Sequence, residues 1–208
     1  MSLVKRLLLI STVSVTALAA GLVSTASASR LSTGEPRFRA IWNEVVFAKE
    51  AISIRCPVTL EGSFHSRTLT KVQGTLVGFI TRASVATCVG GRMRWLTSRL
   101  PWHIKHESFA GVLPNITSIT YRGVGAEFQL EYTVLGLPIS CLYVTAEPNS
   151  LSVTFRRDTA TRQLSRVSLF MTELPSGTGG SCRSIGITGE SNQPTRLGAP
   201  EAITVLLI

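Results

Sequence analysis

The chain has 208 residues, of which 44% are hydrophobic and 16% are charged, and its formal net charge is +9 at pH 7. No dense run of Lys and Arg accompanies this charge, so nucleic acid is not an expected partner. Beyond the N-terminal segment no stretch reaches the ~18 to 20 consecutive apolar residues of a spanning helix. We therefore expect no integral membrane span in the rest of the chain.

The first 28 residues follow the order of a cleavable export signal. Lys5 and Arg6 form a basic start, an uncharged and mostly apolar stretch covers Leu7–Val23, and small residues fill positions 24–28. An uncleaved membrane anchor is the alternative, but hydroxyl residues interrupt the apolar stretch and disfavour it. We predict a signal peptide over 1–28 and a single exported β domain over 29–208, secreted or held outside the cytoplasm in the cell envelope.

Strand signals dominate the rest of the chain. Apolar and polar residues alternate, or β-branched and aromatic residues cluster, over 52–60, 69–81, 116–122, 127–134, 139–145, 151–157, 162–171 and 203–208. The segments on either side of Asp158 are predicted to pair as a hairpin. Short strands separated by Gly- and Pro-rich turns predict an all-β domain, an antiparallel β-sandwich or barrel of about nine or ten strands.

One segment near the start of this region fits two periodicities. Phe38, Trp42 and Val45 are spaced as on one face of a helix, whereas Phe38, Trp42 and Val46 also fall on one face of a strand. The β character of the surrounding sequence favours a strand.

All four cysteines, Cys56, Cys88, Cys141 and Cys182, follow the signal segment. An even number of cysteines in an exported chain predicts disulfides, and three pairings are possible. We favour Cys56–Cys88 and Cys141–Cys182 because sequential pairing closes the shorter loops. A four-thiolate metal site is disfavoured because no CxxC pair is present.

Removing Lys5 and Arg6 with the signal lowers the formal charge from +9 to +7. A basic exported domain is attracted to acidic partners, so an anionic envelope polymer or a lipid surface is the predicted partner class. The alternative is that the charges are scattered and merely solvated. Asp158 is the only aspartate, which disfavours calcium loops and Asp-oriented catalytic triads.

Two distinctive stretches carry a resemblance to a known group. The sequences CPVTLEGSFHS, from Cys56 to Ser66, and LPWH, from Leu100 to His103, resemble those of a group of exported bacterial proteins with no assigned function. The resemblance covers most of the chain after the signal. It implies a single exported domain and brings no catalytic or binding residue with it.

The histidines are the natural candidates for proton transfer at neutral pH. His65 lies between Ser63 and Ser66, but the local sequence is not a nucleophile elbow. His103 and His106 are three apart in an extended segment, where such residues face opposite sides and cannot share a metal. We therefore predict no catalytic residue, no metal and no cofactor.

Ligand binding offers a different set of residues. Trp102, with its neighbour His103 and with His65, is the best candidate for a ligand-binding group. The alternative is that Trp42, Trp95 and Trp102 fill the hydrophobic core, which is the more common place for large aromatic residues in a β protein of this size. The leading hypothesis is a non-enzymatic exported domain that binds an envelope or extracellular component. The alternatives are a small secreted hydrolase with a His base, and a barrel that carries an apolar ligand.

Overall fold

The computed structural model describes residues 30–112, 115–177 and 182–207. The predicted signal peptide lies outside this range. Within it, no helix has the length and apolar character needed to cross a bilayer.

The described chain is built from strands and one short 3₁₀ turn, η1 (Thr97–Arg99). The strands are β1 (Arg30–Thr33), β2 (Arg37–Lys49), β3 (Ile52–Phe64), β4 (Thr68–Thr70), β5 (Leu76–Val85), β6 (Arg92–Trp95), β7 (Trp102–Val112), β8 (Asn115–Val124), β9 (Glu127–Val134), β10 (Leu137–Val144), β11 (Leu151–Arg157), β12 (Leu164–Leu174), β13 (Ile185–Ser191), β14 (Thr195–Arg196) and β15 (Val205–Leu207). The predicted all-β class is confirmed.

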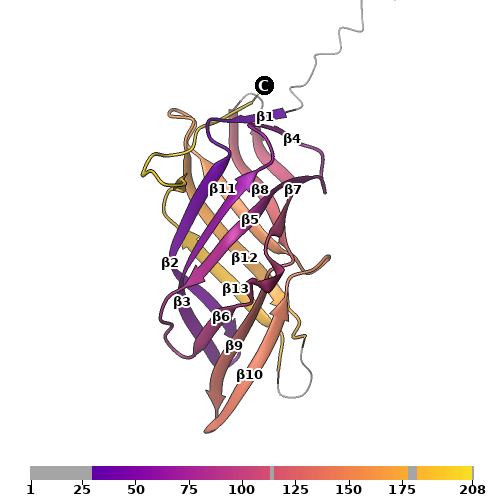
Figure 1. Cartoon of the computed structure of the whole chain (residues 1–208), viewed down its shortest axis with the longest axis vertical. Helices are drawn as coiled ribbons and strands as arrows, with labels where there is room; N and C mark the ends of the chain where they lie inside the picture. Colours follow the sequence, from indigo (N-terminus) through magenta and orange to yellow (C-terminus); the bar gives the residue numbers. More distant parts are fainter. Residues whose placement is uncertain (1–29, 113–114, 178–181, 208) are drawn as a thin grey trace, which may run out of the picture.

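The largest sheet closes on itself. Its strand order is β13-β12-β11-β8-β7-β5-β3-β2-β14, and β13 also pairs with β2, so eight antiparallel strands form a barrel (Figure 1). β13 pairs with the second half of β2 and β14 with the first half, so the two short strands share one edge of β2. Closure leaves few strand edges exposed, which removes a common site of aggregation.

Two three-stranded sheets extend the barrel at its ends. β15-β1-β4 lies at the upper end in Figure 1, and β10-β9-β6 lies at the lower end. The buried guanidinium of Arg157 helps to hold the upper end, because it donates to the carbonyl of Val205 at 2.9 Å and to that of Ile116 at 2.9 Å.

The disulfides are those predicted, Cys56–Cys88 and Cys141–Cys182, with Cα–Cα distances of 4.3 and 5.6 Å. Their positions explain their structural role. Cys88 precedes β6 and Cys141 lies within β10, so each disulfide joins one edge of the lower sheet to the main barrel or its connections. At both of these edges the ladder of backbone hydrogen bonds is reduced to one isolated bridge, between Arg55 and Val89 and between Tyr143 and Ser176.

The ambiguous segment is a strand, β2, and its apparent helical spacing has a structural cause. The pairing with β3 shifts register between Trp42 and Val45, which marks a β-bulge. Phe38 and Trp42 face the core before the bulge, and Val45 and Phe47 face it afterwards. The additional residue changes the spacing of the inward positions from two to three, which mimics a helical pattern.

Most predicted strands coincide with observed ones, and the differences lie at glycines and short elements. The predicted strand over 69–81 is two strands, β4 and β5, separated by a turn at Gly74, whose φ is +78°. The predicted hairpin around Asp158 is β11 paired with β12. β13 was not predicted because it contains Gly186 and Gly189. Glycine has no side chain and therefore adds nothing to an alternating pattern of apolar and polar residues.

Candidate functional site

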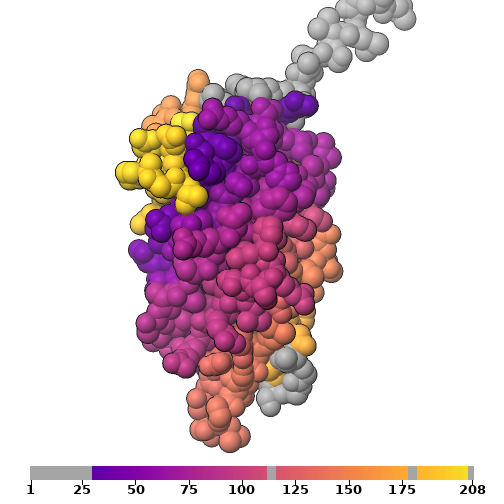
Figure 2. Space-filling model, in the orientation of Figure 1, coloured from indigo at the N-terminus to yellow at the C-terminus, as the bar shows by residue number. Residues whose placement is uncertain are grey.

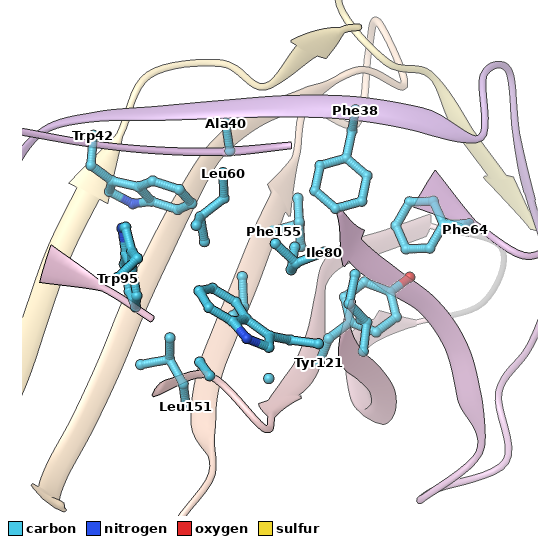
Figure 3. Close-up of a pocket in the computed structure, with 15 residues that line it drawn as sticks. Phe38, Ala40, Trp42, Leu60, Phe64, Ile80, Trp95, Tyr121, Leu151 and Phe155 are labelled. Atoms are coloured by element: carbon cyan, nitrogen blue, oxygen red, sulfur yellow. The ribbon is translucent and has the colours of Figure 1, made fainter. Parts of the chain in front are cut away.

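The barrel encloses a cavity of about 40 Å³ near its centre. Figure 3 shows Trp42 and Trp95 at one end of it and Phe38, Phe64 and Tyr121 at the other. The lining side chains come from β2, β3, β5, β6, β7, β8 and β11, together with Ala126 just before β9. The cavity surface is entirely apolar, so this site suits hydrocarbon groups rather than water or ions.

Aromatic rings in contact with one another build the cavity wall. The ring centroids of Trp95 and Trp102 are 5.0 Å apart, and those of Phe38 and Phe64 are 5.2 Å apart. Gly62 makes room for this arrangement, because a Cβ at that position would lie 2.7 Å from the ring of Phe38. Ring pairs at these distances pack favourably, so much of the apolar wall is aromatic.

The three tryptophans of the wall differ in their hydrogen bonding. The indole Nε1 of Trp42 donates to the carbonyl of Val167 at 3.1 Å. The Nε1 atoms of Trp95 and Trp102 are buried without a partner among the described residues. A buried N–H without an acceptor is unfavourable by about 1–3 kcal/mol. Neither N–H contributes to the cavity surface, which is wholly apolar.

The size of the cavity limits what it can hold. At about 40 Å³ the cavity has room for roughly three water molecules, far below the ~300–1,000 Å³ of sites for drug-sized ligands. Side chains thus fill most of the interior. Only a group of about three heavy atoms, such as the branched end of a chain, fits without rearrangement.

His106 is the one histidine inside the barrel. Its side chain is 1% exposed and its ring packs edge-on against that of Tyr121, with centroids 5.8 Å apart. Nδ1 has no hydrogen-bond partner among the described residues. Burial, with a smaller contribution from the charge of Lys71, lowers the pKa of His106. The neutral imidazole is therefore the stable form in the fold.

The predicted binding group of Trp102, His103 and His65 is divided between the two faces of the sheet. Trp102 faces the interior, whereas His65 and His103 are exposed on the outside. The two histidines do meet at one place, since each ring contacts Phe79, with centroid distances of 4.7 and 5.5 Å. Alternation along β7 separates Trp102 from its neighbour His103.

The outer histidines have no catalytic surroundings. In the parts of the chain that the structure describes, no serine hydroxyl hydrogen-bonds to a histidine, and no three His, Cys, Asp or Glu side chains gather as metal ligands would. His103 and His106 lie on opposite faces of β7, as their spacing predicted.

A polar cleft of about 610 Å³ lies on the outer surface near Gln73 and Pro148. Its charges neutralise one another. Arg122 donates to Glu107 at 2.6 Å, which raises the pKa of the guanidinium, and Lys105 pairs with Glu147 at 3.1 Å. Because each of these charges has a partner, the cleft offers less to a charged ligand than the interior offers to an apolar one.

Sequence patterns pointed to only part of the interior site. All three tryptophans were predicted as either a binding surface or core, and they serve as core residues that also line a cavity. The phenylalanines and Ala126 could have been added to the predicted site only if the sequence had shown which residues of each strand face the barrel interior.

No protein-family model, curated protein or solved structure matches this chain. The resemblance to exported bacterial proteins thus remains a prediction from its motifs, and any function must be argued from the geometry alone.

Proposed function

We propose that this chain is a non-enzymatic exported domain that binds a small apolar component of the envelope or its surroundings, with the barrel interior as the binding site. The observation that carries this proposal is the wholly apolar cavity at the centre of a closed barrel, lined by three tryptophans. The size of the cavity favours a ligand that inserts one compact apolar group.

The exported location has its own support. The basic, apolar and small-residue order of the first 28 positions is that of a signal peptide. Two disulfides, with no free cysteine among the described residues, fit an oxidising compartment.

The test uses the disulfide-intact protein with defined probes. Xenon reports dry apolar cavities, and propane adds a hydrocarbon of three carbon atoms that matches the size of the cavity. Indole ¹H–¹⁵N resonances are recorded during each titration. We expect xenon and propane to bind and to shift the resonances of the three tryptophans, because all three rings line the cavity.

A cavity-filling variant separates binding from folding. Ala126 is buried and borders the cavity, so Ala126→Val is expected to fill it and to weaken binding of each probe at least tenfold. The unfolding transition should remain cooperative. Absence of binding by both xenon and propane to the wild-type chain would refute the proposal.

A further inference from the structure

The hairpin of β9 and β10 extends from the lower end of the molecule (Figures 1 and 2). Its tip is unusually apolar for an exposed turn. Leu135 is 97% exposed and Leu137 is 69% exposed, and Val134 beside them is also exposed. Side chains of this kind at a projecting tip are candidates for contact with another apolar phase.

The conformation of the tip adds a second observation. Leu135 has φ of +51° and Gly136 has φ of +82°. Two successive residues with positive φ are typical of the tight hairpin turn that favours Asn-Gly. Leucine at the first position is strained, and its side chain, 97% exposed, gains almost nothing from packing on the described residues to offset that strain. Backbone strain of this kind is a reason to look for a function at position 135.

Charge is absent from the whole outer part of the hairpin. Glu131 and Glu147 are the nearest charged residues on either side, and the fifteen residues between them carry none. Arg92 on β6 lies opposite Glu131 in the sheet, four residues from Leu135 along β9. At ~3.4 Å per residue this places the arginine backbone about 14 Å from the tip.

The distance from the apolar tip to Arg92 fits the boundary region of a bilayer better than it fits a pocket in a protein. Peripheral elements enter the boundary between headgroups and acyl chains by ~5–10 Å, so Arg92 would lie near the phosphates when the leucines reach the acyl region. A narrow convex tip also suits a fluid phase, which closes around it, more than the flat surface of a folded partner.

We propose that the tip of the β9–β10 hairpin inserts into the interfacial region of a lipid bilayer, with Leu135 and Leu137 as the inserting side chains. The hairpin is preorganised for this contact. Eight residue pairs join β9 to β10, β6 pairs with the other edge of β9, and the disulfide of Cys141 fixes β10. This proposal does not depend on a ligand in the barrel.

The experiment measures flotation of the disulfide-intact protein with vesicles of phosphatidylcholine containing a minority of phosphatidylglycerol. Leu135→Asn is the central variant because it removes the apolar side chain and supplies a residue that the turn prefers. We expect about tenfold weaker partitioning for Leu135→Asn and further weakening on adding Leu137→Thr. The thermal stability of Leu135→Asn should equal or exceed that of the wild-type protein, so loss of binding cannot be attributed to unfolding.

Phe170→Thr provides the matched control. Phe170 is 53% exposed on β12, which belongs to the nine-stranded sheet and not to the sheet of the hairpin, so its replacement should leave partitioning unchanged. Binding should depend only weakly on salt, because apolar insertion dominates. Equal partitioning of wild-type protein and Leu135→Asn, or no partitioning of the wild type, would overturn the proposal. So would concentration-dependent self-association that Leu135→Asn abolishes, since it would assign the tip to a second copy of the chain.

Discussion

His106 links the packing of a single side chain to the pH dependence of the whole fold. The ring lies against Tyr121, with Lys71 and Glu107 as the charged groups that influence it, and its pKa is lowered mainly by burial. In the unfolded chain a histidine takes up its proton near pH 6.5. The unfolded state therefore binds more protons than the folded state as the pH falls below this value, and the folded state loses stability.

We expect the free energy of unfolding to decrease as the pH falls from about 6.5 through the folded pKa, and to be insensitive to His106 above pH 7.5. His106→Phe preserves a ring beside Tyr121 and removes the titration. Urea unfolding at a series of pH values, compared between the two proteins, measures the effect. Parallel pH profiles would show that another group is responsible.

The tryptophans of the cavity wall provide a comparison at the same scale. Trp42→Phe removes packing volume and the hydrogen bond to Val167, whereas Trp102→Phe removes similar volume from a side chain whose N–H has no partner. Trp42→Phe should therefore destabilise the protein by about 1–2 kcal/mol more than Trp102→Phe. Denaturant unfolding with unchanged slopes gives the two values. A larger loss for Trp102→Phe would imply an unseen acceptor at its indole.

At the scale of elements, the disulfides compensate for the few backbone hydrogen bonds that join the edges of the lower sheet to the rest of the chain. Replacing Cys141 and Cys182 together by serine reopens a 41-residue separation, and the chain-entropy model gives a loss of about 4 kcal/mol. Stability should decrease locally, in the lower sheet, as well as in the whole protein. Hydrogen exchange should accelerate in β9 and β10 more than in β2 and β3, which pair along most of their length.

The matched control replaces Cys56 and Cys88, which should lower the free energy of unfolding by a similar amount but affect the β6 side of the lower sheet. Uniform acceleration of exchange across the barrel in both variants would mean that the sheet and barrel unfold as one unit.

At the scale of the whole molecule, the two proposed sites lie at separate positions. The cavity is near the barrel centre, and the hairpin tip extends from the lower end (Figure 1). Substitutions at distant sites without shared partners usually act independently. We expect Leu135→Asn to leave the dissociation constant for xenon unchanged, and Ala126→Val to leave vesicle partitioning unchanged. Titrations of each single variant and of the double variant measure the coupling.

Coupling between the two sites would have a specific meaning. If vesicles weakened or strengthened probe binding in the wild type but not in Leu135→Asn, insertion of the hairpin would be shown to alter the barrel interior through β9, whose residue Phe128 contacts Trp95.

Particular residues show how far the sequence alone determined this protein. Alternation over 127–134 and 151–157 predicted β9 and β11 with their observed bounds, because side-chain period in a strand is set by the backbone. Cysteine number and spacing favoured the observed disulfides. The hydrophobic pattern thus determined the all-β class.

Tertiary structure decided how those strands pair and which side chains they bring together. Barrel closure depends on β2 pairing with β13, some 140 residues away in sequence, and no local pattern encodes that contact. The same closure places Trp42, Trp95 and Trp102 around one cavity and leaves His103 outside it. A side chain's neighbours across a closed sheet depend on strand order and register, whereas its own strand sets only the face on which it lies.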